Sequence, residues 1–176
     1  MIKCLKFTHC NILEIGIELK TFEQFIHQFH LLFTWIMKET ITYSQDTKID
    51  AAQFRDILVL STLGGRRPID DIERLQQMLD HAQLLITAWA GEKLVGISRA
   101  LTDFSYCTYL SDLAVDQAYQ GQGIGTTLIK ITKECAPMTK LILLSAPKAV
   151  DYYPKIGMEK HPACFVLDDL SALRKN

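Results

Sequence analysis

The sequence has almost no net charge and no long apolar run, and each absence excludes a class of protein. Its 176 residues carry a formal charge of −1, whereas binding to nucleic acid or to an anionic membrane requires a basic face. No apolar stretch reaches the roughly 20 residues of a membrane-spanning helix. The N-terminus also lacks the basic start, apolar centre and small-residue cleavage site of a signal peptide. We therefore expect a cytoplasmic protein that binds neither nucleic acid nor membrane.

The cysteine spacing of a disulfide scaffold or a metal site is missing as well. The five cysteines are scattered, and no two of them form a CxxC pair. That pattern predicts reduced, buried thiols and no bound metal. The remaining composition, with 48% apolar and 22% charged residues, is ordinary for a globular protein, and a chain of this length suits one domain with one core.

Residues 1–36 differ from the rest of the chain. Apolar residues recur there at helical spacing, namely Phe22, Phe25, Ile26, Phe29, Phe33 and Ile36. The spacing predicts a helix over about residues 21–36, whose apolar stripe must pack on the domain, on a second copy as a homodimer, or on another partner. In the alternative interpretation the natural protein starts at Met37, and the preceding segment has no packing role. We therefore divide the chain into an N-terminal extension, residues 1–36, and a domain, residues 37–176.

From Ile41 onward, strand-like and helix-like segments follow one another. Alternation or short apolar runs predict strands at residues 41–44, 84–89, 93–102, 107–115, 140–144, 158–161 and 163–167. Helical periodicity and capping residues predict helices at residues 51–60, 68–81, 126–133 and 149–155. The order of these segments predicts a mixed α/β domain with a partly antiparallel central sheet.

A glycine-rich turn, Gln120-Gly121-Gln122-Gly123-Ile124-Gly125, joins one predicted strand to the next predicted helix. Glycine allows unusual φ angles, so backbone amides can converge on one point, and the helix N-terminus adds partial positive charge. The turn therefore predicts a phosphate-binding site. It lacks the GK[ST] of a nucleoside triphosphatase loop, because Gly125 is followed by Thr126-Thr127. A dinucleotide fold would need an acidic residue after the next strand, where the chain reads Leu144-Ser145-Ala146.

Coenzyme A is the third phosphate ligand bound by such turns, and two motifs resemble one family that uses it. Leu113-Ala114-Val115-Asp116 followed by Gln120-x-x-Gly123-x-Gly125 resembles the Q/R-x-x-G-x-G/A motif of the GCN5-related N-acetyltransferases. Downstream, Asp151-Tyr152-Tyr153 with Gly157-Met158 resembles the family's aromatic-Tyr-x-x-x-Gly-Phe segment. The resemblance covers about Ile41 to Leu167. It implies a mostly antiparallel twisted sheet flanked by helices, with a splay between the fourth and fifth strands.

The sequence departs from the family pattern at three places. Gln117 stands where the family often has proline, Ala146-Pro147 where it often has asparagine, and Met158 where it usually has phenylalanine. The second change removes one expected side-chain contact to the cofactor. The third is a conservative exchange of one core residue for another.

The resemblance implies that acetyl-CoA is the acyl donor and that an amine is the acceptor. The residues implied to surround the pyrophosphate are Gln122, Gly123, Ile124, Gly125 and Thr126. Gln120 would shape the turn, and the backbone of Leu113 and Val115 would pair with pantetheine as an added strand does. The implied activity is N-acetyl transfer to a primary amine of a small molecule or protein by direct attack. The alternative is a domain that senses CoA without turnover.

Catalysis would need a proton donor for the departing thiolate and a route for the amine's proton. Tyr153 lies where the family places its general acid, and a phenol suits a thiolate of similar basicity; alternatively it only packs. Asp112 is the candidate base, with ordered water as the alternative, and strand alternation predicts that it faces away from Ser111 and Tyr109. Arg66 and Arg67 could bind a carboxylate or phosphate of the acceptor, or form a solvated surface pair.

Overall fold

The computed structural model describes residues 40–174. All of these except Thr40 belong to one compact unit, Ile41–Asn176. The predicted extension, residues 1–36, and its helix lie outside the described residues, so both stay predictions. Within residues 40–174, none of the helices has the length and apolar character needed to cross a membrane.

A five-stranded sheet in the order β1-β2-β3-β4-β5 forms the centre of this unit. The strands are β1 (Ile41–Ser44), β2 (Leu84–Ala90), β3 (Lys93–Thr102), β4 (Cys107–Val115) and β5 (Lys140–Ile142). Neighbouring strands are antiparallel except β4 and β5, which are parallel and pair only along Cys107–Tyr109 of β4. The two strands therefore part beyond Tyr109, which confirms the predicted mixed sheet and its splay.

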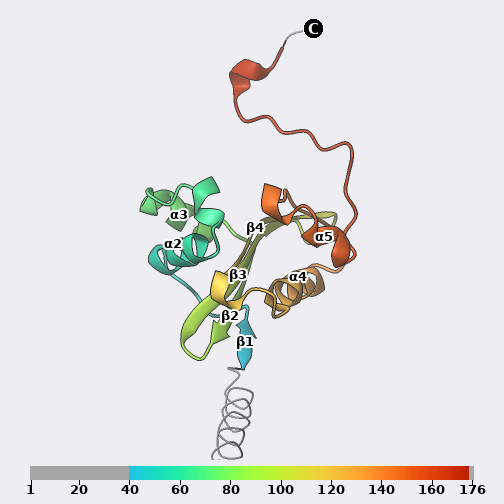
Figure 1. Cartoon of the computed structure of the whole chain (residues 1–176). Coiled ribbons are helices and arrows are strands. Elements are labelled where there is room, and N and C mark those ends of the chain that lie inside the picture. Colours follow the sequence, from blue (N-terminus) through green and yellow to red (C-terminus); the bar gives the residue numbers. More distant parts are fainter. Residues whose placement is uncertain (1–39, 175–176) are drawn as a thin grey trace, which may run out of the picture. The chain divides into compact units, whose positions relative to one another are not determined.

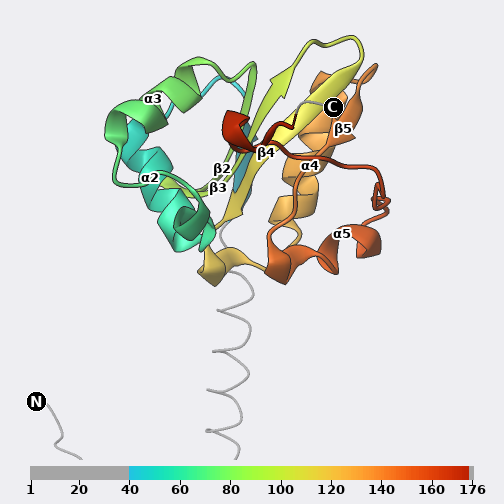
Figure 2. The same cartoon turned by 90° about the horizontal axis from the view of Figure 1, so that it is seen from above.

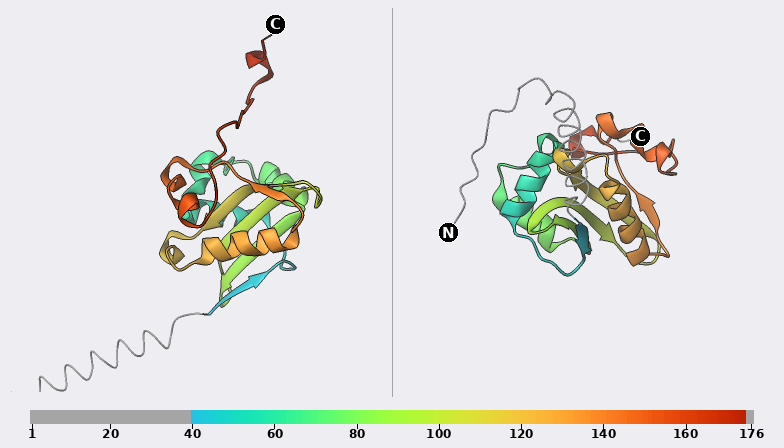
Figure 3. Two further views of the ribbon diagram at one scale, coloured as in Figure 1. Left: turned by 90° about the vertical axis from the view of Figure 1, so that its right-hand side faces the viewer. Right: turned by 60° about the horizontal axis from the view of Figure 1, so that its bottom comes forward.

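Helices cover both faces of the sheet (Figures 1 and 2). On one face lie α2 (Ala51–Leu60) and α3 (Ile72–Asp80), where Phe54 and Leu75 pack with Ile97 and Ala114 of the sheet. On the other face lies α4 (Ile124–Cys135), seen crossing the strands in Figure 3. Full burial of each large apolar side chain stabilises the fold by about 1.5–3 kcal/mol. The apolar contacts on each face therefore hold the helices of that face on the sheet.

Close contact fixes α4 against β3 at Gly96. A methyl group at this position would lie 3.2 Å from Leu128 and 3.3 Å from Ile124 of the helix. Leu128 and Ile124 are buried and pack with Ile86 and Val95 of the sheet. The absence of a side chain at Gly96 therefore lets the helix approach the strand, and with it the turn that precedes the helix.

Acidic N-caps set the starts of α2 and α3. Asp50 accepts a hydrogen bond from the Gln53 amide at 2.7 Å, and the Gln53 side chain accepts one from the Asp50 amide at 3.1 Å, a reciprocal capping box. The prediction that the second helix begins at Pro68 was wrong. Residues 68–71 form a turn closed by the Asp71 amide and the Pro68 carbonyl at 3.1 Å. The Asp71 side chain then caps α3 by accepting from the Arg74 amide.

The C-terminal stretch differs most from expectation. The strands predicted at 158–161 and 163–167 do not form, and within the described part of the chain the sheet ends at β5. Pro162 between them cannot donate a ladder hydrogen bond, and the Phe165 side chain is 91% exposed. Without a further strand beside it, β5 stops at Ile142 and is not the buried strand expected over 140–144. Cys164 is likewise an exposed thiol, not a buried one.

Candidate active site

A β-bulge interrupts β4 at the point where β5 ends. Arg99 of β3 pairs with Asp112, while the next residue, Ala100, pairs with Leu110, so Ser111 is an extra residue on β4. The prediction that Asp112 and Ser111 face opposite ways was wrong, because the bulge brings both to one guanidinium. Arg99 donates to Asp112 at 2.6 Å and to the Ser111 hydroxyl at 2.8 Å.

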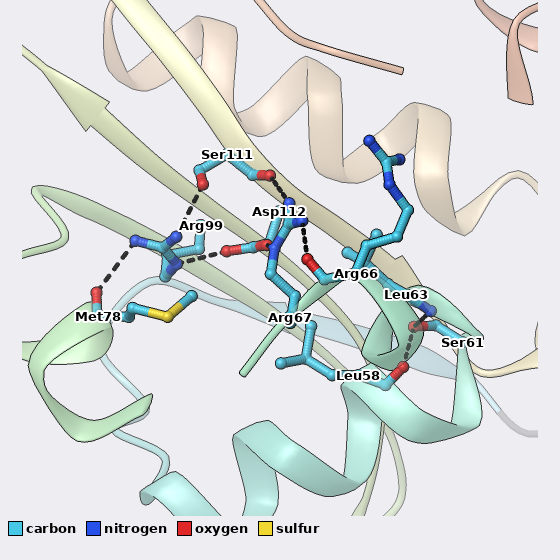
Figure 4. A network of polar contacts seen from close by, with 9 residues as sticks. All are labelled: Leu58, Ser61, Leu63, Arg66, Arg67, Met78, Arg99, Ser111 and Asp112. Atoms are coloured by element: carbon cyan, nitrogen blue, oxygen red, sulfur yellow. Dashed lines mark hydrogen bonds and ion pairs between the residues drawn. The ribbon is translucent and has the colours of Figure 1, made fainter. Parts of the chain in front are cut away.

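Asp112 is fully buried between two arginines (Figure 4). One carboxylate oxygen accepts from Arg99 and the other from Arg67 Nε. Arg67 also donates to the Ser111 carbonyl at 2.7 Å, and Arg99 donates to the Met78 carbonyl at 3.1 Å. The carboxylate therefore joins β4 to β3 and to the segment between α2 and α3.

Arg66 and Arg67 have different surroundings although they are adjacent. The Arg67 side chain is 19% exposed and is held by Asp112. Arg66 ends the short 3₁₀-helix η1 (Leu63–Arg66) and is exposed, and its guanidinium points away from Asp112 in Figure 4. Within residues 40–174 the Arg66 guanidinium makes no hydrogen bond or ion pair, whereas its carbonyl accepts from Arg67 at 2.8 Å. One arginine of the pair is thus structural, and the other is available to a ligand.

Tyr153 lies on α5 (Tyr152–Lys155), a single helical turn. A Schellman motif ends this helix: the Gly157 amide donates to the Pro154 carbonyl and the Met158 amide to the Tyr153 carbonyl, with Gly157 at φ +91°. Burial raises the pKa of the Tyr153 phenol, and Tyr152 adds to this effect, while the positive charge of Arg66 acts in the opposite direction. The phenol therefore keeps its proton at neutral pH.

The glycine-rich turn has the left-handed backbone that its composition predicts. Gly121 and Gly123 have φ angles of +75° and +83°, and Gly123 is the N-cap of α4. Within residues 40–174, no main-chain amide from Gly121 to Thr126 donates to a carbonyl; the first that does is that of Thr127, to Gly123 at 3.0 Å. These free amides at a helix N-terminus are suited to phosphate oxygens.

Two side-chain hydrogen bonds tie this turn to its neighbours. The Gln120 side chain donates to the Val115 carbonyl at 2.9 Å, which joins the turn to the end of β4. The hydroxyls of Thr126 and Tyr152 lie 2.9 Å apart, which joins the first turn of α4 to α5. The two sequence motifs, far apart along the chain, are therefore adjacent in space.

The end of β4 is also fixed by a buried carboxylate. Asp116 accepts from Lys93 at 2.8 Å and from the Ala118 amide at 3.0 Å. Burial alone would raise the pKa of Asp116, but Lys93 and the Ala118 amide outweigh it and lower the pKa. Beyond Tyr109, the β5 side of β4 has no strand partner among the described residues. The backbone of Leu113 and Val115 thus lies on a strand edge that is fixed at its end and can accept an extended ligand.

Sequence reasoning missed the parts played by Arg99 and Tyr152. Arg99 lies in the otherwise weakly polar run Gly96-Ile97-Ser98-Arg99-Ala100-Leu101. A charge in a central strand needs a buried partner, and this signal could have pointed to Asp112. Tyr152 has no comparable signal, because its contact with Thr126 depends on the distance between two helices.

Among the described residues, no group of three His, Cys, Asp or Glu side chains could hold a metal ion. A cavity of about 450 Å³ lies beside β1, lined by Tyr43, Ser44, Gln45, Asp46, Ile86 and Ile131. None of the predicted site residues lines that cavity, so the candidate site remains the region between the glycine-rich turn, β4, α5 and η1.

Comparison with known proteins gives consistent matches. Residues 65–173 match a family described as an acetyltransferase (GNAT) domain. The chain is similar to GCN5-related N-acetyltransferase 2, chloroplastic, of Arabidopsis thaliana, at 32% identity over 74 residues, which are 40% of this chain and 29% of that protein. It is similar to histone acetyltransferase TAP1 of Glycine max, at 31% identity over 74 residues, which are 40% of this chain and 32% of that protein. The chain thus spans about a third of the length of these plant relatives.

A solved structure is similar in fold. An acetyltransferase of the GNAT family from Streptococcus pneumoniae superposes with a TM-score of 0.60 at 22% sequence identity. The superposition covers 74% of this chain and all of that one (100%). At this identity the likeness shows the fold alone, and it agrees with the sheet and helical layers described above.

Proposed function

Because the chain belongs to the GNAT acetyltransferase family, we propose that it binds acetyl-CoA and transfers the acetyl group to a primary amine of a small molecule or protein. One observation carries this proposal: the free amides of residues 121–126 open at the N-terminus of α4, next to the unpaired edge of β4 and to α5. A diphosphate, an extended amide chain and a reacting end would each meet suitable groups there.

The residues of the turn fit the phosphate end of the donor. A methyl group added at Gly121 or Gly123 would meet no atom within 4 Å, so the space around these amides is open. Gly123, Ile124, Gly125 and Thr126 would direct their amides at the pyrophosphate, and Gln122 would flank it. Gln120 shapes the turn through the Val115 carbonyl. Leu113 and Val115 would hold the pantetheine amides through their backbone.

Tyr153 is the group that we assign to proton donation. When bound, acetyl-CoA supplies an activated thioester carbon. The acceptor nitrogen forms a bond to that carbon as the carbon–sulfur bond breaks, and the Tyr153 hydroxyl gives its proton to the departing thiolate. A backbone amide near Val115 would stabilise the carbonyl oxygen. A phenol that stays protonated at neutral pH is suited to this task.

We assign the removal of the amine's proton to solvent and not to Asp112. The carboxylate is fully buried, and each oxygen already accepts from a guanidinium. A base role would remove the single negative charge that both arginines share, which is costly in the interior. Water at the open side of the site has no such barrier.

The test separates acetyl transfer from CoA binding without turnover. Calorimetric titration with acetyl-CoA measures binding, and a thiol-reactive dye measures CoA release with a panel of amines that includes a histone peptide, since one relative is named a histone acetyltransferase. We expect saturable binding and amine-dependent thiol release. Tyr153→Phe should lower the turnover number about 100-fold or more and leave the dissociation constant of acetyl-CoA within about 2-fold.

The matched control is Tyr106→Phe, which removes a hydroxyl from a tyrosine that is 77% exposed. It should behave as the wild type in both assays. Binding of acetyl-CoA without thiol release for any amine would support the alternative, a domain that senses CoA without turnover. Absence of acetyl-CoA binding would refute the proposal as a whole.

A further inference from the structure

We propose that the acceptor amine carries a carboxylate or phosphate group, that Arg66 binds this group, and that the Arg67–Asp112–Arg99 cluster positions Arg66. This inference rests on the proposed acetyl transfer and adds the chemical class of the acceptor to it. The observations that carry it are the different surroundings of two adjacent arginines, one held by Asp112 and the other exposed, and the unequal charges of the cluster formed by Arg67, Asp112 and Arg99.

The segment that carries Arg66 is held at both ends. At its start, the buried Ser61 hydroxyl donates to the Leu58 carbonyl at 3.0 Å and accepts from the Leu63 amide at 3.3 Å. At its end, Arg67 donates to Asp112 and to the Ser111 carbonyl of β4. Between them, Gly64 is buried so closely that a methyl group would lie 3.3 Å from the Leu58 carbonyl. The backbone of Arg66 is therefore fixed relative to β4.

The charges of the cluster do not balance. Arg67 and Arg99 share the single carboxylate of Asp112, and their other acceptors are neutral: the carbonyls of Met78 and Arg66, and the carbonyl and hydroxyl of Ser111. Within residues 40–174 no second carboxylate pairs with either arginine. The cluster of Arg67, Asp112 and Arg99 therefore carries a net charge of one positive unit in a mostly buried position. Arg66 adds a second positive charge at the surface. Together they favour an anion on this side of the site.

Arg66 has the position and the free donors to hold that anion. Its guanidinium has no hydrogen bond or ion pair among the described residues, and it is exposed. Its positive charge acts to lower the pKa of the Tyr153 phenol, against the larger effect of burial. A planar guanidinium binds a carboxylate or phosphate through two parallel hydrogen bonds. An amine that carries such a group would therefore be oriented with its nitrogen toward the reacting end.

Paired amines test the inference. β-Alanine is compared with propylamine, and phosphoethanolamine with ethanolamine, at saturating acetyl-CoA; the two pairs distinguish carboxylate from phosphate. We expect the wild type to prefer the anionic member of at least one pair. Arg66→Gln should lower kcat/KM for that amine about 10- to 100-fold, the range of a charge-assisted hydrogen bond, and change the neutral partner less than about 2-fold. Arg66→Lys should restore part of the loss.

Arg67 tests the positioning role separately. Arg67→Gln should reduce the preference for the anionic amine although the residue does not face the acceptor, mainly through KM, with the dissociation constant of acetyl-CoA unchanged. Arg67→Lys, which can still pair with Asp112, should recover part of the preference. Unchanged preference in a folded Arg67→Gln protein would overturn the positioning role. The matched control is Arg55→Gln, which removes an arginine whose side chain is 42% exposed and pairs with the exposed Asp56.

The failure of this inference can be told apart from failure of the proposed function. Equal or better use of the neutral amines, or failure of both anionic amines to bind the acetyl-CoA-saturated protein, overturns the inference and leaves acetyl transfer intact. Weaker acetyl-CoA binding by Arg66→Gln also overturns it, because Arg66 would then serve the donor's phosphates. Absence of acetyl-CoA binding by the wild type would refute both this inference and the proposed function.

Discussion

Replacing Asp112 by asparagine should destabilise the protein strongly, because the carboxylate holds two arginines in the interior. The side chain is fully buried, and each oxygen accepts from a guanidinium. Asparagine has nearly the same shape but only one acceptor oxygen, so its NH₂ group would face a donor. Removing one partner of a buried ion pair costs about 3–5 kcal/mol. For a domain of this size that corresponds to a fall in Tm of roughly 10–20 °C.

The assay is thermal and urea unfolding followed by circular dichroism, with Asp46→Asn as the control. Asp46 is exposed, and its replacement should change the free energy of unfolding by less than about 0.5 kcal/mol. A double-mutant cycle with Arg67→Gln adds a second measurement. The two changes should be less harmful together than their sum, with a coupling of about 0.5–3 kcal/mol. A loss below about 1 kcal/mol for Asp112→Asn, with no coupling to Arg67, would refute the arrangement in Figure 4.

Two further changes test the turn and the acid. Tyr153 should ionise above the ordinary tyrosine pKa of about 10, since burial raises its pKa. Activity that depends on its proton should therefore persist through neutral pH and fall only in the alkaline range. Arg66→Gln removes a charge that lowers this pKa, so it should move the fall in activity to still higher pH. Ultraviolet difference titration against Tyr153→Phe measures the pKa directly, and ionisation below that of free tyrosine would contradict the assignment. Gly123→Ala forces an alanine to φ +83°, which costs about 1–2 kcal/mol and should weaken acetyl-CoA binding, whereas Gly65→Ala, at a site with no atom within 4 Å and no positive φ, should leave binding unchanged.

Local signals in the sequence were sufficient for the main elements. The bounds of β3 and β4 follow from strand-like residues between turn residues, and the start of α2 follows from the cap at Asp50. The composition of the glycine-rich turn indicates its left-handed backbone, because glycine, as at Gly121 and Gly123, adopts positive φ angles at little cost. These features depend on residues close together in the chain.

Features that depend on distant contacts could not be predicted in this way. The bulge at Ser111 has no glycine to mark it, so alternation gave the wrong face for Asp112. The choice between Pro68 and Asp71 as the start of α3 was decided by the Asp71 cap. Strands predicted near Phe165 had the right residue types, but a strand needs a neighbour to pair with. Arg67 is held inside the protein and Arg66 is exposed because Asp112, a residue of a different element, pairs with Arg67.

The extra residue at Ser111 decides which helical layer each part of β4 faces. Leu110, on one side of it, packs on the α4 layer with Ala136, whereas Ala114, on the other side, packs on the α2 layer with Phe54. Deleting Ser111 alone would leave Arg99 paired with Asp112 and Ala100 with Leu110, so each part of β4 would keep its face. The Ser111 carbonyl and hydroxyl, which accept from Arg67 and Arg99, would be lost, so the deletion should loosen the arginine cluster without exchanging the two layers.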